Sequence, residues 1–297
     1  MPMEIIAQWQ RPEGRSVRCS LCFRGCLLAP GETGFCGARM VPELPEGATA
    51  RLVSPWLGGF VSQAVDPIEK KPLYHWRPGS LIYSLGSVGC TMACPFCQNH
   101  SISRPEPARL PRLLDRGLKI PPEELAPRTR GLGLSAVALT YNEPTLQAEY
   151  ILKAAPLLRQ QGIALVLVTN GMVSPAPAEA LAPWVDAANI DLKTFNTEAY
   201  ARLGGSLDTV KSTITTWVRA GVHVEVTCLV VPGISDSIGE LEAMTDWLAS
   251  LSPDLPLHLS RYFPSFHYNA PPTDRRLLDR MAETAQRRLR HVHLGNV

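Results

Sequence analysis

The sequence has little net charge and no long apolar run. Its 297 residues carry a formal net charge of +2, which is too small to indicate binding to nucleic acid. No apolar run is long enough to span a bilayer. The chain start, from Met1 to Ile6, lacks the basic and apolar regions of a signal peptide. These absences predict a cytoplasmic protein without a membrane-spanning segment.

The sequence also lacks short repeats and low-complexity tracts. Hydrophobic residues make up 45% and charged residues 19% of the chain, which is the composition of an ordinary folded protein. The length allows one large α/β domain or two smaller ones.

The chain does contain many cysteines. Eight of them in a protein not expected to be secreted indicate metal binding rather than disulfides. Seven fall into two groups. The eighth, Cys228, stands alone in an apolar strand, and we interpret it as a core residue.

The more informative group is Cys90, Cys94 and Cys97, with three and then two residues between the cysteines. An apolar run at residues 81–85 and a glycine-rich stretch precede them, which predicts a buried strand followed by a loop carrying the thiols. Three thiolates are one fewer than the four that usually hold a [4Fe–4S] cluster, so one iron would stay open for a ligand. A zinc site with three thiolates and a chance cluster of core cysteines are the alternatives.

The other group is Cys19, Cys22, Cys26 and Cys36, surrounded by proline and glycine turns. So short a segment has little core of its own and would need a metal to become ordered. Four thiolates suit either structural zinc or a second [4Fe–4S] cluster, and the spacing does not decide between them. Unmetallated thiols are the third alternative.

Composition divides the chain into three parts. Residues 1–50 form the four-cysteine metal module, and their last ten residues resemble a linker. Residues 51–79 are an irregular connection, in which residues 65–79 form either a surface loop near the site or a packing segment. Residues 80–297 form the core, where residues 104–131 are expected to be a long connection.

From residue 81 onward, strand-like and helix-like runs alternate, which implies a parallel sheet. Strands are expected at residues 81–85, 136–140, 164–169, 187–191, 222–231 and 257–259, and helices at 145–160, 177–181, 207–220, 238–251 and 273–289. Six units are too few for a closed eight-stranded barrel. We therefore predict an α/β fold, an open partial (β/α)6 barrel, whose strands end near residue 260 and leave no additional lid domain.

Polar motifs follow four of these strands. They contain Glu143, Asn170, Asp191 with Lys193, and the segment that begins at Val231. Each motif alone could be a helix cap or a turn. Because working residues gather at the carboxyl ends of parallel strands, all four are expected on one rim with the three-cysteine loop.

The three-cysteine spacing resembles the signature of the radical S-adenosylmethionine (SAM) superfamily, and the order of motifs resembles its glycyl-radical-enzyme (pyruvate formate-lyase) activating branch. The four-cysteine segment, the stretch from Val65 to Leu73, Tyr-Asn-Glu-Pro in place of Gly-Gly-Glu-Pro, and the closing Leu-Gly-Asn-Val resemble the AmmeMemoRadiSam-system enzymes. This resemblance covers nearly the whole chain.

The resemblance implies roles for individual residues. Cys90, Cys94 and Cys97 would ligate the cluster. The SAM contacts would be Glu143 to the amino group, Asp191 to the ribose, Lys193 to the methionine carboxylate, Val231 beside the adenine, Phe96 stacked near it, and Asn170 close to the same site. Asn142 stands where the activating enzymes carry glycine.

The resemblance also implies a function. A radical SAM oxidoreductase-type, activating-enzyme-like protein would use a [4Fe–4S] cluster to cleave SAM reductively, and the resulting 5′-deoxyadenosyl radical would abstract hydrogen from a partner protein or its bound substrate. The implied partners are a reductant such as flavodoxin or ferredoxin, and a Memo-type or AMMECR-type protein or a glycyl radical enzyme, under anaerobic conditions. Direct glycyl-radical activation is one alternative, and a non-catalytic iron–sulfur scaffold that binds SAM is another.

Overall fold

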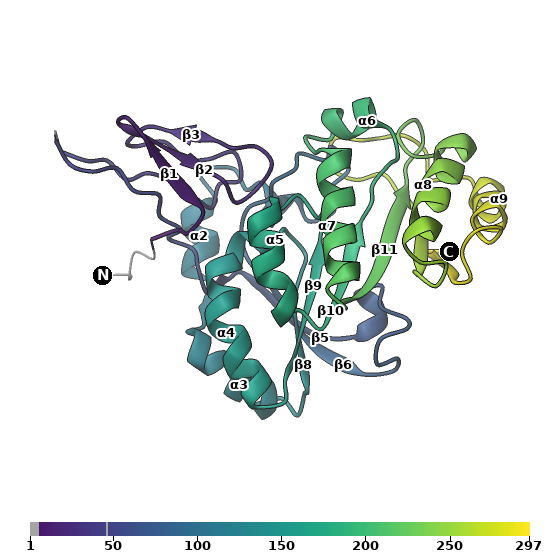
Figure 1. The fold of residues 1–297 in the computed structure, drawn as a ribbon, viewed down its shortest axis with the longest axis horizontal. Coiled ribbons are helices and arrows are strands. Elements are labelled where there is room, and N and C mark those ends of the chain that lie inside the picture. The colour runs from purple at the N-terminus through teal and green to yellow at the C-terminus, as the bar shows by residue number, and fades with distance from the viewer. Residues whose placement is uncertain (1–5, 46) are drawn as a thin grey trace.

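The computed structural model describes residues 6–45 and 47–297 (Figure 1). Most of the chain start that we inspected for a targeting signal, residues 1–5, lies outside the described residues. Within the described residues, no helix is both long and apolar enough to cross a membrane.

An eight-stranded sheet forms the centre of the fold, in the order β13-β12-β11-β10-β9-β8-β6-β5. Neighbouring strands from β6 to β13 pair in parallel, and β5 pairs antiparallel with β6 at one edge. The strands are β5 (Ser62–Pro67), β6 (Leu81–Gly86), β8 (Ala136–Leu139), β9 (Ala164–Thr169), β10 (Ala187–Asp191), β11 (His223–Val230), β12 (Leu257–Arg261) and β13 (Val292–Gly295). The expected open partial barrel is confirmed.

The expectation that strands end near residue 260 is wrong. Strand β13 follows the last helix and adds a seventh parallel strand, paired with β12. It is only four residues long, carries a histidine and a glycine, and lies at the sheet edge, so it lacks the apolar run by which the other strands were recognised.

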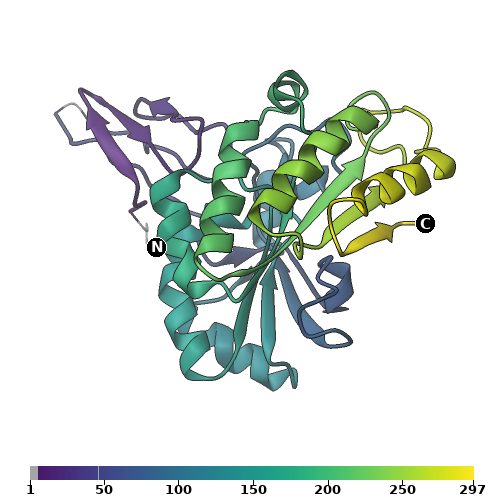
Figure 2. The same ribbon diagram turned by 45° about the vertical axis from the view of Figure 1, so that its right-hand side comes forward.

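Helices cover the outer face of the sheet (Figure 2). They are α4 (Ala148–Gln160), α5 (Pro175–Leu181), α7 (Leu207–Arg219), α8 (Ile238–Leu251) and α9 (Arg275–Ala285), with the short α6 (Thr197–Arg202). Ser206 and Ser237 cap α7 and α8 by accepting a hydrogen bond from a backbone N–H in the first turn. Trp217 of α7 is fully buried and donates to the Ala178 carbonyl of α5 at 3.0 Å, which fixes these two helices side by side.

Residues 104–131 are not the long connection that we expected. They contain α2 (Leu110–Asp115), β7 (Leu118–Lys119), which pairs with β4 (Gly59–Phe60), and α3 (Pro122–Gly131); α1 (His100–Ser103) precedes them. Both α2 and α3 have a proline in their first two positions. Proline is compatible with a helix there, because the first N–H groups have no partner within the helix. The prolines thus begin helices instead of excluding them.

The irregular segment of residues 68–79 packs against the inner face of the sheet. Ile68, the first residue of the short 3-10 helix η1 (Ile68–Lys70), and Leu73, which follows that helix, have fully buried side chains. They form one apolar cluster, together with Trp76, against strand residues Ile82, Ala136, Ala138, Ala164, Val166 and Ala187. Glu225 of β11 accepts the backbone N–H groups of Tyr74 and His75 at 3.0 and 2.8 Å. Of our two expectations for this segment, packing is therefore correct, and we call residues 68–79 the plug.

The N-terminal residues form a separate antiparallel sheet of β1 (Gln10–Glu13), β2 (Ser16–Cys19) and β3 (Leu27–Leu28), which lies beside α5 (Figure 1). A buried ion pair docks this region on the barrel. Arg39 Nη2 lies 2.7 Å from each of the two carboxylate oxygens of Glu149 on α4. Each of the two side chains is 1% exposed. Glu149 also accepts the backbone N–H of Gln8 at 2.7 Å, so one helix residue holds two N-terminal segments.

Candidate cofactor-binding site

One large cavity opens at the carboxyl ends of the parallel strands. Its volume is about 310 Å³, which lies at the lower end of the range for small-molecule and cofactor sites. Seven of the residues singled out in the sequence line it: Cys90, Cys94, Phe96, Cys97, Asn170, Asp191 and Lys193. They come from loops after three different strands, as the expected rim requires.

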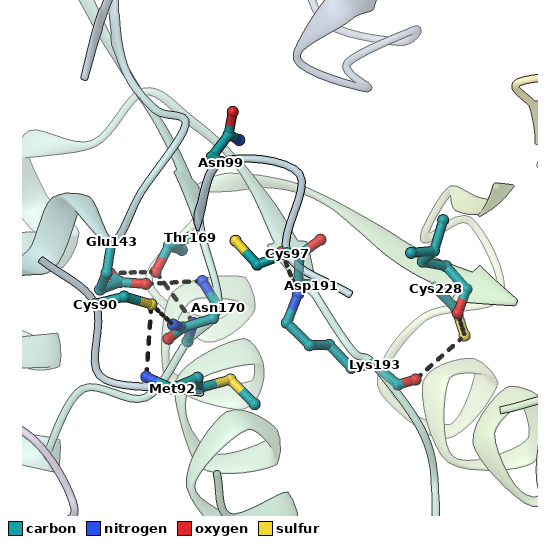
Figure 3. A network of polar contacts seen from close by, with 12 residues as sticks. Cys90, Met92, Cys97, Asn99, Glu143, Thr169, Asn170, Asp191, Lys193 and Cys228 are labelled. Carbon is teal, nitrogen blue, oxygen red and sulfur yellow. Dashed lines mark hydrogen bonds and ion pairs between the residues drawn. The ribbon is translucent and has the colours of Figure 1, made fainter. Parts of the chain in front are cut away.

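Cys90 lies in a polar environment that suits a metal-bound sulfur (Figure 3). Its Sγ accepts hydrogen bonds from the Met92 backbone N–H at 3.5 Å and from Asn170 Nδ2 at 3.4 Å. Such donors stabilise a thiolate and tune a cluster that the thiolate ligates. The loop is anchored by Asn142, whose Nδ2 donates to Ser87 Oγ and to the Gly89 carbonyl at 2.9 Å each. Asn142 therefore has a structural role of its own where the resembling enzymes carry glycine.

The donor set fits a [4Fe–4S] cluster with three protein ligands. All eight cysteines are free thiols, and three of them share this cavity. Burial raises the pKa of Cys90, and it raises that of Cys94 to about 11, so binding a metal here would release protons. Among the described residues, no three metal-binding side chains are grouped closely enough to hold a single metal ion.

Asp191 and Lys193 form an ion pair on the cavity wall, with Lys193 Nζ 2.8 Å from Asp191 Oδ2. Burial acts to lower the pKa of Lys193, but the negative charge of Asp191 and its hydrogen bond outweigh burial and raise that pKa. The lysine is therefore a permanent cation beside the cysteine loop. It can bind a carboxylate, while the aspartate can accept hydrogen bonds from hydroxyl groups.

Glu143 does not line the cavity. Its side chain is fully buried, and Oε1 accepts three hydrogen bonds, from Thr145 N, Thr145 Oγ1 and Thr169 Oγ1, at 2.6–2.9 Å. Oε2 accepts the Asn170 backbone N–H at 2.9 Å (Figure 3). Burial raises its pKa. Glu143 thus holds the ends of two strands together, and its contact to the SAM amino group stays a prediction.

Val231 and Phe96 lie in different surroundings. Val231, which directly follows β11, is fully buried and its N–H donates to Ser235 Oγ at 2.8 Å, whereas Leu229 and Thr227 of β11 line the cavity. Phe96 contacts the edges of Tyr262 and Tyr268, with ring centroids 6.4 and 6.3 Å apart. Phe96 is therefore held rigidly at the cavity wall.

Sequence reasoning missed several lining residues. Lys70, Lys71 and Tyr141 lie on one wall, and Ser260 and Asn296 also border the cavity. Lys70, Lys71, Tyr141 and Asn296 belong to segments that carried the family resemblance, and Ser260 directly follows the sixth expected strand. Nothing in their spacing indicated that they would meet.

The other four cysteines also share a cavity, lined by Cys19, Cys22, Cys26 and Cys36 with Arg24 and Arg39. Burial raises the pKa of Cys19, of Cys36 and, to about 12, of Cys22. The two cysteine groups are neighbours, since the Cys36 carbonyl accepts the Cys90 N–H at 3.3 Å. Gly89 permits this approach, because a Cβ there would lie 2.3 Å from that carbonyl oxygen.

We expect Cys19→Ser or Cys36→Ser to remove one metal equivalent and to lower stability, because a metal at these thiols would order a segment with little core of its own. The measurement is iron, sulfide and zinc content with a thermal unfolding curve, on anaerobically prepared wild type and variants. Cys228→Ser is the control for losing a thiol outside both groups. Identical metal content in wild type and both variants would show that these thiols are not ligands.

A family model matches more than half of the chain. Residues 85–248 match the radical SAM superfamily. An uncharacterized protein of Methanocaldococcus jannaschii is 33% identical over 293 residues, which is 97% of this chain and 84% of that protein.

Solved structures share the fold. A radical SAM methyltransferase from Sphaerobacter thermophilus aligns with a TM-score of 0.54 and 17% identity, over 74% of this chain and 67% of that one. QueE from Escherichia coli aligns with a TM-score of 0.51 and 15% identity, over 80% of this chain and 93% of QueE. Streptococcus suis SuiB bound to S-adenosylmethionine aligns with a TM-score of 0.54 and 15% identity, over 70% of this chain and 48% of SuiB.

Proposed function

Since this chain belongs to the radical SAM superfamily, we propose that it cleaves SAM reductively and abstracts hydrogen from a partner protein or from that partner's bound substrate. One observation carries the proposal: a single cavity joins the three thiols to the Asp191–Lys193 pair. A cluster at the three thiols and the polar ends of SAM at this pair would thus be adjacent.

Cys90, Cys94 and Cys97 would hold the cluster, which together with SAM would supply the radical chemistry. The chain's own residues bind and orient. Lys193 would hold the methionine carboxylate through a charge-assisted hydrogen bond, and Asp191 the ribose hydroxyls. Asn170 donates to Cys90 Sγ and, through its backbone N–H, to Glu143, so it couples the cluster loop to the β8 and β9 ends.

The partner completes the site in this proposal. A reactive carbon radical must be kept from water, which is the task of a lid or of a bound partner. The cavity is open at its mouth, so a docked macromolecule would close it. A Memo-type or AMMECR-type protein, as the AmmeMemoRadiSam resemblance implies, is the proposed partner, with flavodoxin or ferredoxin as reductant. Direct activation of a glycyl radical enzyme is the alternative.

We also propose the division of the chain into the metal module of residues 1–50, the connection of residues 51–79 and the core of residues 80–297. The separate sheet of β1 to β3 supports the first boundary. The second metal, zinc or [4Fe–4S], belongs to this module.

The test is anaerobic incubation of the reconstituted protein with SAM and a reductant, with 5′-deoxyadenosine measured by chromatography. Production above the level seen without reductant is the expected result, and it should rise when the partner is added. Binding of SAM without any 5′-deoxyadenosine, with a reduced cluster and a partner present, would favour the non-catalytic scaffold instead.

We expect Lys193→Ala to weaken SAM binding about ten- to a hundredfold, because a charge-assisted hydrogen bond of about 1.5–3 kcal/mol is lost. The visible absorption of the reconstituted cluster should not change, since Lys193 is not a ligand. Isothermal titration with SAM measures the effect, and Lys153→Ala, an exposed lysine on α4, is the matched control. Equal SAM affinity in both variants would place the SAM carboxylate elsewhere.

A further inference from the structure

A second group of charges lies in the same cavity and has no part in the proposed SAM contacts. Lys70 and Lys71, at the start of the plug, line the cavity together with Tyr141 from the loop after β8. Lys71 is unusual, because its side chain is 2% exposed while that of Lys70 is 68% exposed. A buried lysine is costly unless an opposite charge faces it.

Asp66 of β5 holds this group together. Its Oδ2 accepts hydrogen bonds from Lys71 Nζ and from Tyr141 Oη, both at 2.8 Å. Lys70 Nζ reaches Oδ1 at the longer distance of 3.3 Å. Burial acts to raise the pKa of Asp66, but the Lys71 and Tyr141 hydrogen bonds hold it well below its usual range, so the carboxylate is always charged.

Tyr141 is fixed in an uncommon conformation. Its φ is +72°, in the left-handed region that favours glycine. Three contacts hold it: its hydroxyl on Asp66, its carbonyl accepting Asn99 Nδ2 at 2.8 Å, and its ring 4.6 Å from Lys71 Nζ. Gly86 leaves room for the ring, because a Cβ there would meet Tyr141 Cδ2 at 2.9 Å. A strained backbone conformation of this kind persists where several surrounding contacts hold it in place, and it is common at ligand sites.

The charges do not balance. Two ammonium groups share the one carboxylate of Asp66, which leaves one positive charge. Among the described residues that line the cavity, Asp191 is the one carboxylate, and Lys193 neutralises its charge. The excess positive charge therefore lies at Lys70 and Lys71. Of the two, Lys70 makes the longer contact to Asp66.

One further polar side chain of the cavity lacks a hydrogen-bond partner among the described residues. Thr227 of β11 lines the cavity and is 8% exposed. Its buried Oγ1 has no hydrogen-bond partner among the described residues. Buried hydroxyls are normally satisfied, so this one points to a ligand with a polar group.

We propose that Lys70 and Lys71 bind an anionic oxygen group of the substrate, a carboxylate or a phosphate, on a wall that Asp66 and Tyr141 keep rigid. The proposal rests on the proposed function in that SAM occupies the Asp191–Lys193 side of the same cavity. The proposal implies that the substrate, or the modified side chain of a protein partner, carries a negative charge. The excess charge steers it to the cavity, and Lys70 closes on it from the open edge.

The test uses the full-length protein, reconstituted anaerobically and saturated with SAM so that Lys193 is occupied. Acetate and inorganic phosphate are titrated separately by isothermal calorimetry, at an ionic strength kept constant with chloride. At least one of them should bind saturably to the wild type. Lys70→Gln should weaken that binding about tenfold or more, because a charge-assisted contact is lost. Since Lys70 is exposed, this variant is expected to fold.

Lys153→Gln is the control for removing one positive charge outside the cavity, and it should bind the anion as the wild type does. Preference for acetate would identify a carboxylate substrate, and preference for phosphate a phosphorylated one. No saturable binding of either anion, or equal binding by wild type and Lys70→Gln, overturns the proposal. Failure of the proposed function is a separate result, namely no 5′-deoxyadenosine from the reduced protein while the anion still binds.

Discussion

Replacing Cys90, Cys94 or Cys97 by alanine is expected to abolish 5′-deoxyadenosine production. A cluster with three protein ligands has no thiolate to spare, and losing one leaves two irons open. The remaining cysteine of the core cannot substitute. Cys228 is 1% exposed within β11, with its Sγ directed at the Lys193 carbonyl at 3.9 Å (Figure 3).

The measurement compares each variant with the wild type after identical anaerobic reconstitution, by chromatography of 5′-deoxyadenosine and by iron content. Cys228→Ala is the matched control, because it also removes a thiol from the core but should keep both cluster and activity. Full production by all three single variants would contradict the radical SAM assignment of this loop.

Glu149→Ala is expected to lower the free energy of unfolding by about 3–5 kcal/mol, the typical cost of removing one partner of a buried ion pair. Arg39 would keep its charge at 1% exposure with no carboxylate to face it. The backbone N–H of Gln8 would lose its acceptor as well. The substitution should therefore release the N-terminal sheet from α4 before the barrel itself unfolds.

Chemical denaturation followed by circular dichroism measures this effect, and limited proteolysis locates it near the N-terminus. Glu179→Ala, an exposed glutamate on α5, is the control for losing one helical carboxylate and should change stability by less than about 0.5 kcal/mol. Equal stability of the two variants would show that the Arg39–Glu149 pair does not dock the N-terminal region.

Much of the barrel could be predicted because its information is local. The apolar runs that became β6 and β8 to β12 are visible within a few residues, and the helices between them show apolar positions three and four apart. The motif at Cys90 also needs no distant partner to be recognised. Asp191 and Lys193 followed from one rule, that parallel strands present their carboxyl ends on one edge.

The remaining features depend on residues that meet only in three dimensions. Thr145, Thr169 and Asn170 donate hydrogen bonds to the Glu143 carboxylate, and that network becomes visible only when two strand ends lie side by side. The plug carries charged residues and prolines that are typical of a surface loop. Its burial results from Ile68 and Leu73 facing the small alanines of the inner sheet.

The plug also sets the order in which the molecule can be assembled. Asn189 donates to the Pro72 carbonyl at 2.8 Å, across 117 positions of the chain, and the Tyr74 N–H reaches Glu225 across 151. A ribosome delivers the plug long before either partner exists, and contacts so distant in sequence form slowly. The loop with Cys90, Cys94 and Cys97 is synthesised during this interval, after the plug and before Asn189 and Glu225. The wall that carries Lys71 can therefore be completed only after β10 and β11 have been made, whereas the three thiols of the core are available earlier.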